Sequence, residues 1–144
     1  MNTKLGWSPL WSSIVSSSLW DEDKDVRLLF LTMLAVKDAN GIVLAKSPSG
    51  LARMANLTLD ETIVAIKVLE APDTKTTQTQ EFEGRRIKPL PDGTGWEILN
   101  HFKYRDATKI MARNSYQADW IAKKRAKEAE AAKLASQNNK KGKK

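Results

Sequence analysis

The pattern of apolar and polar positions predicts several short helices and strands in the first hundred residues. Residues 23–36 are apolar on almost every side and carry acidic residues in the first turn, which is typical of a buried helix. Turn residues follow at 38–41, and the β-branched stretch 42–45 is typical of a short strand. The chain therefore begins its core with a helix followed by a strand.

Two more helices are expected directly after this strand. Residues 51–55 place apolar side chains at helical spacing, and Asn56 ends that helix. Thr58 and Glu61 have the spacing of a capping box. The second helix of this pair should therefore begin at Thr58 and run to about Ala71, before Pro72 prevents its continuation. The positions expected to face outward on this helix are Glu61, Thr62, Ala65 and Val68, with Lys67 as the only base.

A β-hairpin is predicted within residues 84–100. The turn residues Asp92 and Gly93 separate two segments that alternate with a period of two, and Pro89 confines the first segment to an edge of the sheet. Before the first helix, residues 1–20 hold three tryptophans, which should pack on the domain as an arm or a short helix; the alternative is a partner-binding patch.

This order of elements predicts an α+β, mainly α fold, namely a winged helix-turn-helix domain with a basic helical tail. The expected boundaries are 1–103 for the winged-helix domain, 104–136 for a basic helical extension, and 137–144 for a disordered lysine-rich tail. In such a domain residues 58–71 would enter the major groove of DNA, and the hairpin would lie against the neighbouring backbone. The alternative is a protein-binding module with the same elements.

Charge is distributed unevenly along the chain. Residues 1–102 carry a net charge of −2, whereas residues 103–144 carry +9. A cationic arm attracts phosphate backbones without sequence preference, although it could also act only as a solubilising tail. The candidate DNA-binding residues are Lys46, Arg53, Thr62, Lys67, Arg85, Arg86, Lys88, Lys123, Lys124, Arg125 and Lys127.

The predicted helix at residues 58–71 has few side chains of the kinds that read base edges, which are mainly Arg, Lys, Asn and Gln. We therefore expect electrostatic and shape-based binding rather than strong base readout. Duplex DNA is the expected partner ahead of single strands. Tyr104, Tyr116 and Trp120 could stack on the bases of a single strand, but at helical spacing they are expected to pack on the body.

The sequence favours no catalytic, metal-binding or cofactor-binding site, so an enzyme is not expected. It contains no cysteine, a single histidine (His101) that we interpret as structural, and no glycine-rich phosphate-binding motif. The acidic residues at 21–25 are explained by the start of the first helix. No signal peptide or membrane span is apparent, which predicts a cytoplasmic protein with no membrane partner.

Several segments resemble small bacteriophage proteins of the replisome-organiser or replication-initiation type. The resemblance covers roughly residues 7–125 and is carried by the segments 17–20, 26–34, 84–87, 96–105, 116–120 and 123–126. It implies a winged helix that binds origin or replication-fork DNA in the cytoplasm of a phage-infected or lysogenic host, and that helps to recruit a helicase or its loader. A phage transcriptional regulator and a protein-binding adaptor remain alternatives, and a homo-oligomer is compatible with each.

Overall fold

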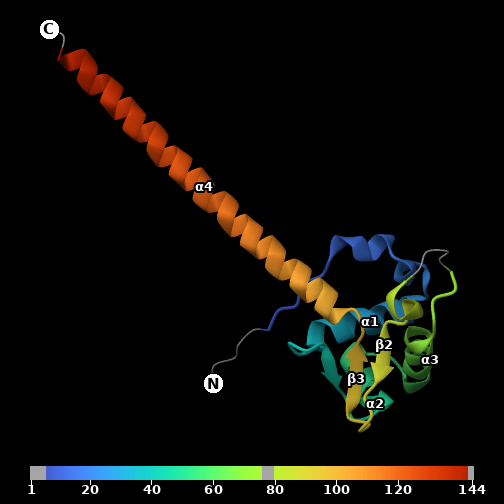
Figure 1. Cartoon of the computed structure of the whole chain (residues 1–144). Coiled ribbons are helices and arrows are strands. Elements are labelled where there is room, and N and C mark those ends of the chain that lie inside the picture. The colour runs from blue at the N-terminus through green and yellow to red at the C-terminus, as the bar shows by residue number, and fades with distance from the viewer. Residues whose placement is uncertain (1–5, 76–79, 143–144) are drawn as a thin grey trace, which may run out of the picture. The chain divides into compact units, whose positions relative to one another are not determined.

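The computed structural model describes residues 6–75 and 80–142, and these residues form a mainly helical chain with one small sheet (Figure 1). The four α-helices are α1 (Lys24–Val36), α2 (Pro48–Ala55), α3 (Leu59–Glu70) and α4 (His101–Lys141). The strands are β1 (Ile42–Leu44), β2 (Ile87–Pro89) and β3 (Gly95–Ile98). The chain divides into two compact units, residues 1–104 and 105–144. The predicted α+β, mainly α class is confirmed.

The core of the first unit lies where α1, α2 and α3 pack against one another. Leu29 and Met33 from α1, Leu51 from α2 and Leu69 from α3 are all completely buried. Burying a side chain of this size stabilises a fold by roughly 1.5–3 kcal/mol, so these four residues account for much of the apolar stabilisation. The helices therefore form one interlocked group rather than separate elements.

A short turn joins α2 to α3. Asn56 ends α2 in the left-handed conformation (φ 54°, ψ 45°), which Asn adopts more readily than most residues. The Glu61 amide donates to the Thr58 hydroxyl at 3.2 Å, and the Thr58 amide donates to the Glu61 carboxylate at 2.9 Å. The predicted capping box is thus confirmed, and it fixes the start of α3 within three residues of the end of α2.

The sheet is antiparallel, with strand order β1-β3-β2. Gly95 pairs with Leu44, and a Cβ atom at Gly95 would lie 2.0 Å from the Val43 carbonyl oxygen, so no larger residue fits there without movement of the backbone. Pro89 lies on the edge strand β2, as predicted, and faces a single neighbouring strand. The hairpin turns at Asp92 and Gly93, where Gly93 has φ 73° and the Thr94 amide donates to Asp92.

The N-terminal arm packs differently from the prediction. It forms two 3₁₀ helices, Ser12–Ser16 and Ser18–Asp21, and the residue that anchors it in the core is Leu19 rather than a tryptophan. Trp7 is 80% exposed, and Trp20 lies under the Arg27 guanidinium at 5.1 Å from the ring centroid. The expectation that the tryptophans bury themselves is therefore wrong for Trp7.

Helix α4 is longer than the sequence suggested. Residues 137–141, expected to be disordered, continue the helix to Lys141, while residues 143–144 lie outside the described part. Extending an existing helix costs far less than nucleating one, so a polar stretch can follow the alanine-rich segment in helical form. Within the described residues no helix combines the length and the apolar character needed to span a bilayer.

Candidate nucleic-acid interface

Three of the predicted DNA-binding cations on the first unit are exposed and form no ion pair within the described residues. Lys46 follows β1, Arg53 lies on α2 and Lys67 lies on α3. Each is therefore available to an anionic ligand.

Thr62 lies on the buried side of α3, so its predicted role is wrong. Its side chain is completely buried, and its hydroxyl donates to the Thr58 carbonyl at 2.8 Å. Ala65, also expected to face outward, is equally buried. The reason is the rotation of α3 about its axis, since Ile66 and Leu69 determine which face of the helix points to the core. Thr62 lies four residues before Ile66 and therefore on the same buried face.

The exposed residues of α3 are Leu59, Asp60, Glu61, Val64 and Lys67. Val64 is 60% exposed and Lys67 is the only cation among the five. Two acidic residues in the first turn stabilise the helix but repel phosphates. The exposed surface of α3 is consequently poorer in base-reading side chains than the sequence analysis expected.

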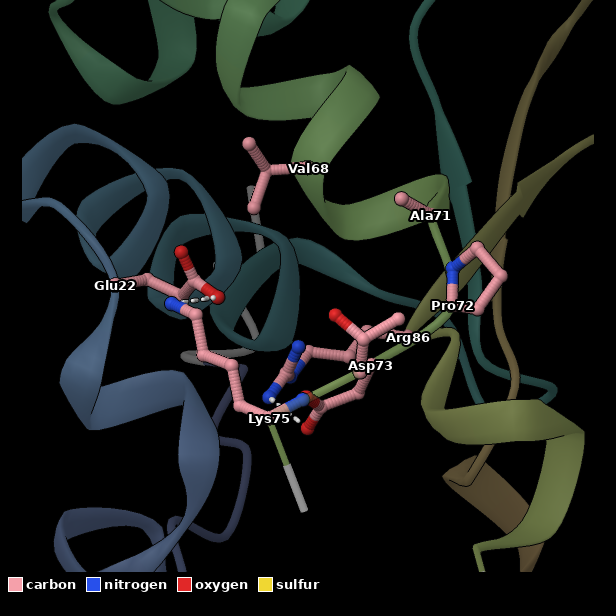
Figure 2. A pocket seen from close by; sticks show the side chains of 8 residues that line it. Glu22, Val68, Ala71, Pro72, Asp73, Lys75 and Arg86 are labelled. Atoms are coloured by element: carbon pink, nitrogen blue, oxygen red, sulfur yellow. Dashed lines mark hydrogen bonds and ion pairs between the residues drawn. The ribbon is translucent and has the colours of Figure 1, made fainter. Parts of the chain in front are cut away.

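Arg86 is turned inward and holds the arm to the rest of the first unit, so its predicted contact with DNA is also wrong. Its guanidinium donates to the Ser18 hydroxyl at 2.7 Å and lies 3.9 Å from the Asp73 carboxylate, and its side chain is only 13% exposed. The Ser18 hydroxyl in turn donates to Asp73. Figure 2 shows Arg86 beside Asp73 among the side chains that line a small pocket.

The pocket of about 230 Å³ is lined by Glu22, Val68, Ala71, Pro72, Asp73, Thr74, Lys75 and Arg86. Its charges are matched: Lys75 pairs with Glu22 at 2.9 Å, and Arg86 lies beside Asp73. The pKa of Lys75 is raised by its contact with Glu22, which favours the charged ammonium. Because two acids face two bases, the pocket serves to fasten the arm rather than to attract a charged ligand.

Asp73 is the acceptor at the centre of this network. The hydrogen bond from Ser18 is the main reason why the pKa of its carboxyl lies below the ordinary range, with further contributions from the Lys75 amide and Arg86. A carboxyl whose pKa is lower in the folded than in the unfolded chain stabilises the fold above its unfolded pKa of about 3.9. That stabilisation is lost as the pH falls through the folded pKa.

We therefore expect Asp73→Asn to lower the free energy of unfolding by roughly 1–2 kcal/mol at pH 7, because hydrogen bonds to an ionised acceptor contribute about 1.5–3 kcal/mol. The variant should also lose less stability than the wild type on acidification below about pH 4. Urea unfolding at several pH values measures both effects. An identical acid profile in the two proteins would show that Asp73 does not contribute to the pH dependence.

The hairpin carries less positive charge than expected. Lys88 lies directly opposite Glu97 on β3 and pairs with it at 3.0 Å, while Arg85 precedes β2 and contacts both the Glu70 carbonyl and Glu83. Both cations are still about half exposed. The tip of the hairpin, residues 90–94, has Asp92 as its one charged residue. The hairpin can therefore contact an anionic ligand through Arg85 and Lys88 but not through its tip.

The second unit carries the larger net positive charge. Residues 105–144 contain 12 Lys and Arg against 4 Asp and Glu. Lys123, Lys124, Arg125 and Lys127 are all exposed on α4 and form no ion pair with any other described residue. These four predicted residues thus form a cluster within one and a half turns of an α-helix, with their charges available to a polyanion.

Comparisons with protein-family models, curated proteins and solved structures found no match.

The remaining polar features of the first unit serve the fold. His101 is buried, its Nε2 lies 2.8 Å from the Ala39 carbonyl oxygen, and its Cβ fills the space that a side chain at Gly41 would need. Across residues 6–75 and 80–142 no group of three or more His, Asp or Glu side chains is arranged to hold a metal ion. The interpretation of His101 as structural agrees with these contacts.

The sequence analysis did not select several candidate contact residues on α4. Lys109 and Arg113 are exposed and form no ion pair within the described residues, and Tyr116 and Trp120 are 72% and 57% exposed. Helical spacing alone could have placed the two cations on one line with the two aromatics. The sequence prediction placed both cations in a helical segment but selected only the cluster at residues 123–127.

Proposed function

We propose that this protein binds DNA, with α4 contacting phosphates and the first unit acting as a winged helix on a duplex. The observation that carries the proposal is the cationic cluster Lys123, Lys124, Arg125 and Lys127, exposed and unpaired among the described residues. A protein that neutralises phosphates releases condensed counterions, which drives binding without requiring base readout. The near-neutral first unit would then contribute shape and a few positioning contacts.

The order and pairing of the elements support a winged helix. A helix and a strand precede two helices joined by a short turn, and a hairpin follows, with β1 pairing to β3 in a three-stranded sheet. In a helix-turn-helix the second helix enters the major groove, which here is α3. Its exposed side chains include two acids and one base, so we propose backbone contacts from Lys46, Arg53, Lys67, Arg85 and Lys88 rather than extensive base contacts.

The resemblance to bacteriophage replisome-organiser and replication-initiation proteins suggests the biological setting. We propose that the DNA is an origin or replication fork and that a helicase or its loader is the protein partner. A transcriptional regulator with the same fold would instead protect one promoter sequence in a footprint. Protection that depends on one operator-like sequence would favour that alternative.

A titration of a labelled duplex of about 20 base pairs with the full chain at about 50 mM salt tests the proposal. We expect a rise in fluorescence anisotropy that saturates and that depends little on the base sequence of the duplex. An unlabelled duplex should compete, whereas a neutral polymer should not. Lack of any binding at this salt concentration would contradict the proposal.

A protein-binding adaptor is the second candidate, and the exposed face of α3 favours it. Val64 is 60% exposed between Asp60 and Lys67, and Met54 on α2 is 47% exposed. Apolar side chains among charges are more typical of protein contacts than of phosphate contacts. A pull-down from nuclease-treated extract tests this candidate. Capture of a helicase or loader, together with no binding of DNA by the purified protein, would favour the adaptor.

A further inference from the structure

Helix α4 presents two aromatic side chains in line with its cations. Tyr116 and Trp120 are four residues apart, which places them on neighbouring turns of the same face. Their side chains are 72% and 57% exposed, values far above those of core aromatics. Exposed rings of this size are costly in water unless they serve a contact, so their shared face requires an explanation.

Cations continue this face in both directions. Lys109 and Arg113 precede Tyr116 by seven and three residues, and Lys123 and Lys127 follow Trp120 by three and seven residues. At about 100° per residue, all six side chains fall on one stripe along the helix, which we call the aromatic–cation stripe. The stripe therefore combines flat rings at its centre with positive charge at both ends.

A direct contact links the two kinds of side chain. The Lys124 ammonium lies 5.5 Å from the centroid of the Trp120 ring, within the range of a cation–π interaction. Asp119 and Glu128 lie roughly 80–100° from the centre line of the stripe, so their carboxylates flank the stripe and do not separate its rings from its cations. The positive potential is thus concentrated where the rings are exposed.

We infer that the aromatic–cation stripe binds single-stranded DNA, with Tyr116 and Trp120 stacking on bases while the flanking cations contact phosphates. Residues four apart are separated by about 6 Å along a helix axis. This distance is nearly twice the 3.4 Å spacing of stacked bases, so the two rings suit successive bases of an unstacked strand. A duplex hides the faces of its bases, and the rings add nothing to duplex binding.

The sharing of one face by aromatic rings and cations distinguishes this stripe from a membrane-binding helix. Helices that lie in a bilayer interface keep their aromatic residues and their lysines on opposite faces. Here the rings and the cations share a face, which matches the stacking platforms and cationic grooves of single-strand binding proteins. The inference rests on the proposed DNA-binding function of α4 and extends it to a second form of the ligand.

The test compares the full chain with Tyr116→Ala/Trp120→Ala on labelled dT strands of about 20 nucleotides and on a duplex of similar length. Because stacking on one aromatic side chain contributes several-fold in affinity, we expect a loss of about thirtyfold or more on the single strand. The loss on the duplex should be less than about threefold, because phosphate contacts are unchanged. Far-UV circular dichroism of each variant checks that α4 is retained.

The matched control is Ile110→Ala/Ile121→Ala. These side chains are 59% and 43% exposed on α4 but lie on another face, so their removal should leave both affinities unchanged. Equal losses on both ligands in the aromatic variant, or an equal loss in the control, would overturn the inference. Wild-type binding to the single strand without binding to the duplex would instead contradict the proposed duplex function and leave this inference standing.

Two further ligands complete the experiment. Vesicles of phosphatidylserine and phosphatidylcholine test whether the stripe is a lipid-binding face, and rU strands test whether RNA is the preferred single strand. We expect weaker binding to both than to dT. Binding to vesicles or to rU that is tighter than to dT and depends on Tyr116 and Trp120 would overturn the assignment of single-stranded DNA.

Discussion

Replacing Lys123, Lys124, Arg125 and Lys127 together by glutamine is expected to weaken duplex binding by at least about a hundredfold at low salt. All four side chains are exposed on α4 and unpaired within the described residues, so their charge is available to phosphates rather than to neighbouring acids. Glutamine keeps the helix propensity while removing the charge. Anisotropy titrations of a labelled duplex at equal salt concentration measure the difference in dissociation constant.

The matched control keeps the charge and changes the chemistry of each side chain. Exchanging the three lysines for arginine and Arg125 for lysine should hold the affinity within about threefold of the wild type, because nonspecific binding depends on charge neutralisation. If the glutamine variant binds as tightly as this control, the cationic cluster is a solubilising surface and α4 is not the phosphate-binding element.

The largest expected loss of stability is caused by Leu29→Ala. Leu29 lies on the inner face of α1 and is completely buried in the core. Truncating a buried leucine removes transfer free energy and leaves a cavity, which together cost about 2–5 kcal/mol. This is a large part of the roughly 5–15 kcal/mol that stabilises a typical domain, so the urea midpoint should fall sharply.

Leu28→Ala is the control for this prediction, since it changes the same residue type one position earlier on the same helix. Leu28 is 43% exposed, so its truncation should cost less than about 1 kcal/mol. Urea unfolding of both variants at 25 °C compares the two free energies. Equal losses of unfolding free energy in the two variants would mean that α1 does not pack with Leu29 toward the core and Leu28 toward solvent.

The helices of the first unit could be predicted because local signals and burial agree there. Thr58 and Glu61 fix the start of α3 through contacts between residues three apart, and Asn56 marks the end of α2. The edge position of Pro89 follows from its missing amide hydrogen. Each of these features depends on chemistry within a few residues, which a sequence shows directly.

The directions of individual side chains were harder to predict, because they depend on distant contacts. Thr62 was expected to face outward, but Ile66 and Leu69 set the rotation of α3 and bury it. Arg86 was expected on a wing surface, but its partners Ser18 and Asp73 are 68 and 13 residues away in the sequence. Only the tertiary packing of the arm brings these groups together.

The sequence predicted the helical part of the tail but placed its end too early. Composition favoured a helix over residues 104–136 and disorder from 137 onward, whereas α4 continues to Lys141. Regular helical spacing brings Tyr116, Trp120 and the flanking lysines onto one face within the predicted helix. The candidate site therefore depends on the secondary structure of the tail as well as on its charge.

The salt dependence of duplex binding tests the central claim most directly. If phosphate contacts from α4 and the first unit drive association, the logarithm of the binding constant should fall linearly with the logarithm of salt concentration, by about 0.9 for each phosphate neutralised. With four cations in the α4 cluster alone, we predict a slope of about −4 or steeper for the full chain. A slope near zero, or no duplex binding at about 50 mM salt, would contradict the account.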